Sequence, residues 1–206
     1  MSVAASHRKG AAAKHAPVKL IVLDRDGTLS PDPEDFVRAP EDWVPLPGAL
    51  EAVARLNHGG WRVVLASNQS GLGRGLFDMA TLNAVHARMH KLLAAAGGRI
   101  EAVFFCPHAP EDECCCRKPA PGLFLDIARR MGVPLDSMVA AGDSVRDVQA
   151  AAAAGCEAHL IRTGQSLPVG DGAPLPPDVP AGTQVHADLS AFADFVLARD
   201  AQKVSV

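Results

Sequence analysis

Tyrosine is absent from this sequence, and aromatic residues make up only 4% of its 206 positions. Proteins that bind single-stranded nucleic acid stack bases on aromatic side chains along a positively charged groove. The chain offers few such side chains and has a formal net charge of −3, so its composition does not favour a nucleic-acid partner. Long apolar runs are also lacking, which argues against a membrane-spanning helix and a membrane partner.

The first 18 residues lack the apolar centre of a secretory signal, although they are basic and rich in alanine. We predict a disordered arm over residues 1–18, a single domain over 19–200 and a flexible tail over 201–206. A chain of this length, with 48% hydrophobic residues, can bury a substantial core. Without a targeting signal, we expect a cytoplasmic protein.

The five cysteines are too few and too clustered for a disulfide framework. Four of them lie between Cys106 and Cys116, and Cys156 stands alone. An odd number of cysteines concentrated in one loop is more typical of metal binding than of paired disulfides. Cys156 lies in an apolar segment, where we predict that it is buried.

Apolar segments alternate between strand-like and helix-like patterns along the chain. We predict strands over residues 19–23, 61–66, 101–105, 137–141, 156–161 and 185–188. We predict helices over residues 47–57, 78–96, 121–131, 145–154 and 189–198. Strands that alternate with helices in this way indicate an α/β fold with a parallel sheet and right-handed crossovers.

Polar side chains follow three of these strands at the point where each strand ends. Asp24 and Asp26 follow the first strand, Ser67 the second and Asp143 the fourth, while Lys118 precedes the fourth strand. The carboxyl ends of parallel strands form the ligand-binding edge of such a sheet. Two carboxylates placed together there repel each other unless a cation is present. Asp24, Asp143 and a backbone carbonyl of the first turn therefore form a candidate magnesium site, and Lys118 and Ser67 are candidates to contact a phosphate.

These strand-end residues resemble the four motifs of the haloacid dehalogenase superfamily of phosphohydrolases. The motifs are Asp24-Arg25-Asp26-Gly27-Thr28, then Ser67, then Lys118, then Gly142-Asp143 with Asp147. One such motif is a weak signal, whereas four in the same order are a strong one. The resemblance implies a three-layer sandwich around a central parallel sheet. No insertion in the chain is long enough for a large cap domain.

The resemblance also implies a role for each motif residue. Asp24 becomes the nucleophile that forms an aspartyl-phosphate, and Asp26 the general acid that later acts as a base. Ser67 and Lys118 complete the catalytic set by contacting the phosphoryl group. The magnesium ligands implied in this way are Asp24, Asp26 and Asp143. No role follows for Arg25, which stands between the two carboxylates.

A second constellation lies between the third predicted strand and Lys118. Its C-x-H and C-x-C pairs offer one imidazole and three thiols, enough for a tetrahedral zinc site. We predict that zinc is bound in the loop over residues 106–117 by four residues: Cys106, His108, Cys114 and Cys116. Cys115 is left as a spare thiol. A site filled by four protein ligands is structural, and it would position Lys118 two residues later. Buried apolar cysteines or a redox thiol pair are the alternatives.

A zinc loop directly before Arg-Lys-Pro makes the chain similar to the D-glycero-β-D-manno-heptose 1,7-bisphosphate 7-phosphatase family, over about residues 18–162. That family acts in the synthesis of lipopolysaccharide precursors. The implied substrate is a small sugar bisphosphate, and the loop over residues 32–35 would lie over the sugar. The residues that the resemblance assigns to the substrate are Asn68, Gln69, Ser70, Arg74 and Arg117. Ser144 departs from the pattern, because a lysine often follows the aspartate of the fourth motif.

Three other functions are compatible with parts of the sequence. The histidinol-phosphate phosphatases of histidine biosynthesis share the fold and the zinc loop, although Ser70 and Arg74-Gly75 favour the heptose family. A polynucleotide 3′-phosphatase would share the Asp-x-Asp-Gly-Thr chemistry but needs a basic groove. A non-catalytic zinc module would not need Asp24. By resemblance we expect a monomer, and the sequence leaves the preferred anomer open.

Overall fold

A computed structural model of the chain describes residues 18–32, 37, 39–166 and 174–204. The arm predicted over residues 1–18 lies outside this set except for Val18, and so do residues 33–36. The last two residues of the tail predicted over 201–206 lie outside it as well.

Six parallel strands form one sheet in the order β3-β2-β1-β4-β5-β6. The strands are β1 (Leu20–Leu23), β2 (Arg62–Asn68), β3 (Ala102–Cys106), β4 (Met138–Gly142), β5 (Glu157–Ile161) and β6 (Gln184–His186). All four residues of β1 are buried, as expected for a central strand covered on both faces. The parallel sheet predicted from the alternating pattern is therefore confirmed.

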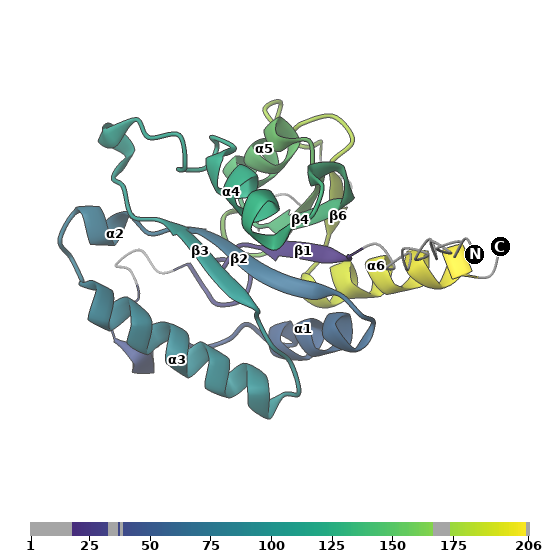
Figure 1. The fold of residues 1–206 in the computed structure, drawn as a ribbon, viewed down its shortest axis with the longest axis horizontal. Coiled ribbons are helices and arrows are strands. Elements are labelled where there is room, and N and C mark those ends of the chain that lie inside the picture. The colour runs from purple at the N-terminus through teal and green to yellow at the C-terminus, as the bar shows by residue number, and fades with distance from the viewer. Residues whose placement is uncertain (1–17, 33–36, 38, 167–173, 205–206) are drawn as a thin grey trace, which may run out of the picture.

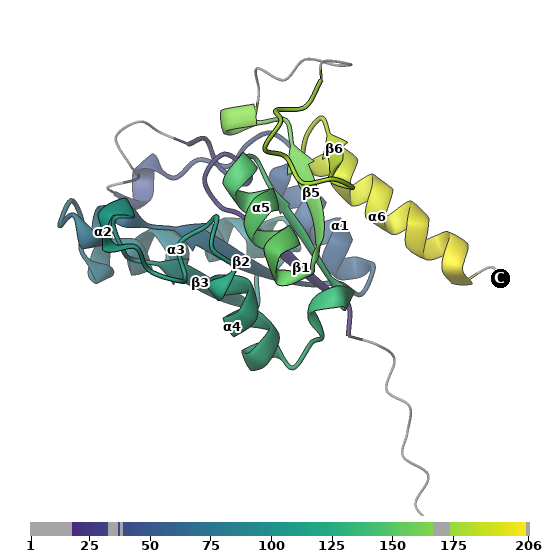
Figure 2. The ribbon, with the colours of Figure 1, turned by 90° about the horizontal axis from the view of Figure 1, so that it is seen from above.

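Helices cover both faces of the sheet and complete three layers (Figure 1). The helices are α1 (Ala49–His58), α2 (Ser70–Gly73), α3 (Met79–Ala95), α4 (Gly122–Met131), α5 (Val145–Ala154) and α6 (Leu189–Val204). Helices α1, α3 and α6 pack below the sheet in this view, and α4 and α5 pack above it. The view from above shows α5 crossing the sheet beside β1 and β5 (Figure 2).

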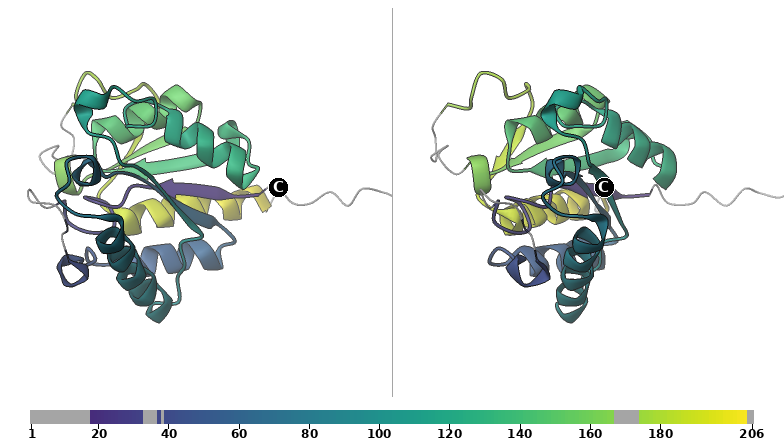
Figure 3. Two further views of the ribbon diagram at one scale, coloured as in Figure 1. Left: turned by 60° about the vertical axis from the view of Figure 1, so that its left-hand side comes forward. Right: turned by 90° about the vertical axis from the view of Figure 1, so that its left-hand side faces the viewer.

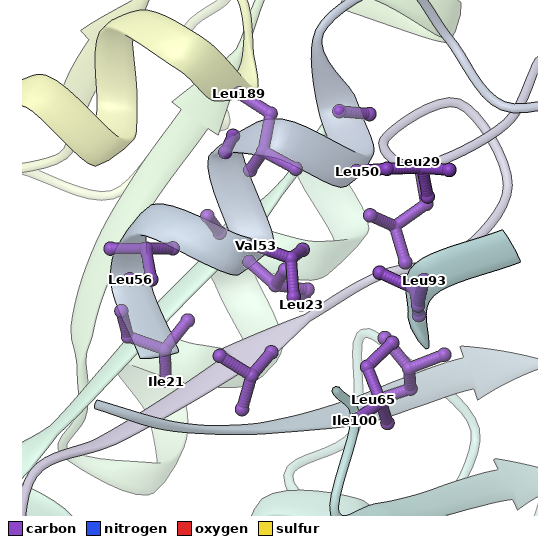
Figure 4. Close-up of a cluster of buried hydrophobic side chains, with 14 of the residues drawn as sticks. Ile21, Leu23, Leu29, Leu50, Val53, Leu56, Leu65, Leu93, Ile100 and Leu189 are labelled. Atoms are coloured by element: carbon purple, nitrogen blue, oxygen red, sulfur yellow. The ribbon is translucent and has the colours of Figure 1, made fainter. Parts of the chain in front are cut away.

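Two apolar clusters hold the three layers together, one on each face of the sheet. On one face, Ile21 and Leu23 of β1 pack against Val53 and Leu56 of α1 and against Leu189 of α6 (Figure 4). On the other face, the alternate β1 residues Leu20 and Val22 face α4 and α5. Alternation along one strand thus supplies both cores, and each fully buried leucine contributes about 2 kcal/mol to folding.

Helix ends follow the local sequence closely. Asp78 caps α3, because its Oδ1 accepts a hydrogen bond of 2.8 Å from the Thr81 amide. The α6 helix continues to Val204, into the segment predicted as a flexible tail, because nothing after residue 198 interrupts it. No helix in the described part of the chain combines the length and apolar character needed to cross a bilayer.

The region at the carboxyl ends of the strands carries several short elements. Helix α2 follows β2 directly, and the loop between β3 and α4 lies beside it, where the Gly73 amide donates to the Pro107 carbonyl at 2.9 Å. Two views from the side show this loop rising next to α2 (Figure 3). The structure therefore brings the Cys/His loop to the edge of the sheet where the motif residues lie.

Candidate active site and metal centres

The strand order places the predicted catalytic residues side by side. Asp24 follows β1 directly, Ser67 is the penultimate residue of β2, and Asp143 follows β4. Because β2 and β4 are the two neighbours of β1, these three side chains meet at one edge of the sheet. They line one pocket together with Asp26 and Lys118.

Lys118 is the buried cation of this pocket, with a side chain only 3% exposed. Its Nζ lies 3.0 Å from Asp24 Oδ1 and 2.5 Å from Asp147 Oδ1, and it donates to the Ala66 carbonyl at 2.7 Å. Burial opposes a charged lysine, but the carboxylates of Asp147 and Asp24 outweigh it and raise the pKa of Lys118. The lysine therefore stays protonated and joins the first motif to the fourth.

Asn68 fixes the backbone at Lys118. Its Nδ2 donates to the Lys118 carbonyl at 3.0 Å, and its Oδ1 accepts from the Lys118 amide at 3.1 Å. The sequence assigned Asn68 to the substrate, yet both groups of its amide are engaged with this peptide. In the structure, Asn68 positions the lysine of the third motif.

Three carboxylates come together beside Lys118, within the reach of a single ion. Oxygen atoms of Asp24, Asp143 and Asp147 lie within 4.8 Å of one another. Burial and the neighbouring Asp147 raise the pKa of Asp143 to about 7, and burial raises the pKa of Asp24 well above its usual value. A hard divalent cation relieves this repulsion, so the donor set fits magnesium.

The carboxylate of Asp26 is not part of this group, although the sequence assigned it to magnesium. Asp147 takes the third place, and its two oxygens are already engaged. Oδ1 contacts Lys118, while Oδ2 accepts from the amide and the hydroxyl of Ser144 at 2.9 and 2.7 Å. Asp147 therefore anchors the lysine and borders the group, whose other two carboxylates, Asp24 and Asp143, are those that the sequence assigned to magnesium.

Gly27 allows the two sheet-edge loops to approach. Its φ is +84°, and a Cβ at this position would lie 2.2 Å from Asp143 Oδ2. The next residue, Thr28, donates its hydroxyl to Asp143 Oδ1 at 3.3 Å. Glycine is needed here both for the left-handed backbone and for the close contact.

Arg25 holds Asp26 in a fixed orientation. Its Nε donates to Asp26 Oδ1 at 2.9 Å and its NH2 group to Asp26 Oδ2 at 2.8 Å, a paired contact made by a residue only 2% exposed. Gln69 Nε2 donates to the same Oδ2 at 3.0 Å and to Ser67 Oγ at 2.7 Å. Sequence reasoning missed this role of Arg25, because the direction of its side chain depends on contacts with Gln69, 44 residues away.

The remaining predicted substrate residues lie outside the pocket, on the side of the Cys/His loop. Arg117 donates to the His108 carbonyl at 3.4 Å, and Arg74 lies 3.8 Å from Glu111. Ser70 is buried at the start of α2. Asp32, which belongs to the loop that the resemblance places over the sugar, lines the pocket. Arg146 and Gln165, which the sequence did not single out, line it as well.

The second cluster has the shape of a four-ligand metal site. Cys106 Sγ lies 3.5 Å from His108 Nδ1, 3.5 Å from Cys114 Sγ and 3.3 Å from Cys116 Sγ. His108 Nδ1 lies 3.3 Å from Cys116 Sγ, and the Cys114 and Cys116 sulfurs are 3.5 Å apart. A tetrahedral zinc ion holds its ligand atoms about 3.5–3.8 Å apart, whereas disulfide sulfurs are about 2 Å apart.

The chemistry of these thiols also fits a cation. Burial, together with Cys106 and Cys114, raises the pKa of Cys116 to about 12. Burial opposes ionisation of Cys114 too, but hydrogen bonds from Cys106 and Cys116 lower the pKa of this thiol to about 7. A bound cation would hold Cys116 as a thiolate beside Cys114. Cys115 is exposed and outside the cluster, as the sequence predicted. All five cysteines are free thiols, so no disulfide links the members of the cluster.

Comparisons with known proteins agree with the motifs. A family model described as haloacid dehalogenase-like hydrolase matches residues 31–155. The D-glycero-beta-D-manno-heptose-1,7-bisphosphate 7-phosphatase of Bordetella bronchiseptica is 53% identical over 87% of this chain and 98% of its own length. The enzyme of the same name from Pseudomonas aeruginosa is 42% identical over 86% of this chain and 97% of its own length.

Solved structures point the same way. The crystal structure of D,D-heptose 1,7-bisphosphate phosphatase from B. bronchiseptica, complexed with magnesium and phosphate, superimposes with a TM-score of 0.81. It is 52% identical and covers 88% of this chain and 99% of that one. The corresponding enzyme from Burkholderia thailandensis gives a TM-score of 0.65 at 48% identity, over 86% and 98% of the two chains.

Proposed function

Since the chain belongs to the haloacid dehalogenase-like hydrolase family, we propose that it removes the 7-phosphate of D-glycero-D-manno-heptose 1,7-bisphosphate as a magnesium-dependent phosphatase. The observation that carries the proposal is the buried cluster in which Lys118 contacts Asp24 and Asp147. Relatives with this named activity are aligned over nearly their whole length, which supports carrying the activity across. The reaction would belong to ADP-heptose and lipopolysaccharide core precursor synthesis.

Asp24 is the nucleophile in this proposal. One of its carboxylate oxygens attacks the phosphorus, the bond between phosphorus and the sugar oxygen breaks, and an aspartyl-phosphate forms. Lys118 lies 3.0 Å from Oδ1 of this carboxylate, so it restricts the side chain and offsets charge on the transferring group. Ser67 accepts a hydrogen bond from Gln69, which leaves its own hydroxyl proton for a phosphoryl oxygen.

Asp26 moves the proton. It donates a proton to the leaving sugar oxygen in the first step and accepts one from the water that attacks the aspartyl-phosphate in the second. Inorganic phosphate then leaves and Asp24 is regenerated. The contacts from Arg25 and Gln69 hold the Asp26 carboxylate in place for both transfers.

Magnesium would be held by Asp24 and Asp143, with the first-turn backbone as a further donor. When bound, the ion neutralises negative charge on the phosphoryl oxygens and on the carboxylates themselves. The raised pKa values of Asp24 and Asp143 support this assignment, because burial disfavours the ionised form of both carboxyl groups and a bound cation would offset that cost.

Zinc would be held by the four residues of the second cluster and would be structural, because no ligand position is left for substrate. The cluster includes Cys116, two residues before Lys118, so an ordered loop fixes the chain that carries the lysine. Arg74 and Arg117 lie next to this loop and remain candidates for contacts with the sugar. We further propose a cytoplasmic monomer acting on a small molecule.

The decisive experiment compares wild-type rates on heptose 1,7-bisphosphate, histidinol phosphate and a 3′-phosphorylated oligonucleotide. We expect the highest kcat/KM on the bisphosphate, with release of one phosphate per sugar. A higher kcat/KM on histidinol phosphate would replace the proposal with the histidine-biosynthesis alternative. Tight, salt-dependent oligonucleotide binding would favour a polynucleotide phosphatase.

A further inference from the structure

One positive charge in the pocket has no function in the reaction described above. Among the described residues that line the pocket, the cations are Arg25, Lys118 and Arg146. Five carboxylates share this pocket, so a bound anion depends on whichever positive charge is still available. The question is which of the three cations can serve a second phosphate.

Two of the cations are already committed. Arg25 is buried and donates to both oxygens of Asp26 and to Gln69. Lys118 is buried between Asp24 and Asp147. Neither can turn towards a distant part of the substrate without leaving a partly or fully buried carboxylate unpaired, which is costly.

Arg146 is exposed and makes no ion pair with any described residue. Its NH2 group donates to the neutral Gln165 Oε1 at 3.2 Å. Gln165 is itself well anchored, because its amide donates to Asp143 Oδ2 and its Nε2 to Asp32 Oδ2, both at 2.8 Å. Arg146 is thus held at the rim of the pocket by an amide that leaves its charge uncompensated.

The local structure of α5 strengthens this position. Arg146 lies in the first turn of α5, where the helix dipole favours an anion. Ser144, two residues before Arg146, donates its hydroxyl to Asp147 at 2.7 Å and offers no charge. The positive charge near the fourth motif is therefore supplied two residues later, by Arg146.

We propose that Arg146 binds the phosphate that is not transferred and so selects for sugar bisphosphates over monophosphates. The guanidinium would donate two parallel N–H···O hydrogen bonds to oxygens of this second phosphate. Its planar group of donors matches the spacing of two phosphate oxygens. The inference rests on the proposed function for the identity of the sugar. It does not rest on it for the preference between one phosphate and two.

The test measures kcat/KM on heptose 1,7-bisphosphate and on heptose 7-phosphate, which lose the same phosphate. Arg146→Ala should lower kcat/KM on the bisphosphate about tenfold to hundredfold and change the monophosphate value less than about twofold. Arg146→Lys should recover part of the loss. Arg130→Ala, which removes an exposed arginine of α4 paired with Asp126, is the matched control and should leave both values unchanged.

Equal losses on both substrates, or no loss on either, would overturn the assignment of Arg146. A loss confined to the bisphosphate in Arg117→Ala, with Arg146→Ala unaffected, would move the second phosphate to the zinc-loop side. If wild type does not hydrolyse the heptose compound, the proposed function fails. In that case kcat/KM of wild type and Arg146→Ala is compared on fructose 1,6-bisphosphate and fructose 6-phosphate. A failure of the proposed function is thereby distinguished from a failure of the assignment of Arg146.

Discussion

Replacing Arg25 with lysine tests whether the arginine orients the proton-transferring residue. Lysine keeps the positive charge but cannot make the paired contact that Arg25 makes with the two oxygens of Asp26. It also loses the bond of 3.1 Å to Gln69, which otherwise ties Asp26 to Ser67. The substitution should therefore free the Asp26 carboxylate to rotate, while the nucleophile and Lys118 stay in place.

The expected size of the effect follows from the geometry. Breaking a buried ion pair completely costs about 3–5 kcal/mol. Here the charge is retained and the Asp26 side chain is 18% exposed, so we expect a loss of about 1–2 kcal/mol in the free energy of unfolding. General acid catalysis contributes about 10²–10⁴-fold, so a misplaced Asp26 should lower kcat/KM for the sugar phosphate about 100-fold.

The assay compares two leaving groups. A sugar alkoxide needs a proton as it leaves, whereas nitrophenolate does not. The value of kcat/KM reports only the steps up to the first irreversible one, which here is the departure of this leaving group. Arg25→Lys should thus lose about 100-fold on the sugar phosphate and less than about fivefold on p-nitrophenyl phosphate. Arg130→Lys is the control. Equal losses on both substrates would refute the orientation argument, since they would place Arg25 in phosphate binding or in general folding.

Four further predictions follow from the two metal centres. Asp24→Asn should abolish turnover without changing zinc content; residual phosphatase activity would exclude Asp24 as the nucleophile. Removal of zinc by a strong chelator, with magnesium restored, should lower Tm and speed hydrogen exchange around Lys118, and an unchanged Tm would rule out a structural zinc. Gly27→Ala should destabilise the fold by roughly 2 kcal/mol and weaken magnesium binding measured by calorimetry. The alanine Cβ would clash with the Asp143 carboxylate, and residue 27 has a φ of +84°, which disfavours any residue other than glycine. The fourth prediction concerns pH. Burial and the neighbouring Asp147 raise the pKa of Asp143 to about 7, so between about pH 4 and 7 the metal-free folded state binds more protons than the unfolded state. The free energy of unfolding of the metal-free protein therefore falls as pH rises through this range. Magnesium binds the ionised form, so the increase in Tm that it causes should grow from pH 5 to pH 8, and Asp143→Asn should flatten that dependence.

The strands and long helices could be predicted from the sequence because their signals are local. Apolar runs placed the strands within about two residues, and the helix predicted over residues 78–96 corresponds to α3, Met79–Ala95. The end of β2 was placed too early, because Ser67 and Asn68 are polar, yet they pair with Phe105 and Cys106 of β3. Helix α2 was missed, since its four residues are too few to show a helical period.

The candidate site was predictable as a set of residues but not as a set of contacts. Chain order and strand ends were enough to predict that Asp24, Ser67 and Asp143 lie together. The partners of those residues come from long-range side-chain directions, which no local pattern encodes. The Gln165 amide donates a hydrogen bond to Asp143, 22 residues away, and Asn68 accepts one from the Lys118 amide, 50 residues away. These contacts show that Asn68 holds the backbone at Lys118 and that Arg25 holds the Asp26 carboxylate, while the substrate contact predicted for Asn68 stays a prediction.

The distance between Lys118 and the second cluster explains why one small domain would use two metals. A lysine buried between two carboxylates must be held tightly, because displacing it leaves Asp24 and Asp147 uncompensated. It lies on a long connection between β3 and α4 that has little apolar content of its own and cannot order itself by burial. Asn68 fixes this loop at the lysine, and the four-ligand cluster ending at Cys116 fixes it two residues earlier. On this reasoning zinc affects catalysis only through the position of Lys118. The activity lost on mutating a zinc ligand should therefore be partly restored by a second substitution that stiffens the loop. No such substitution should restore the activity lost in Lys118→Ala.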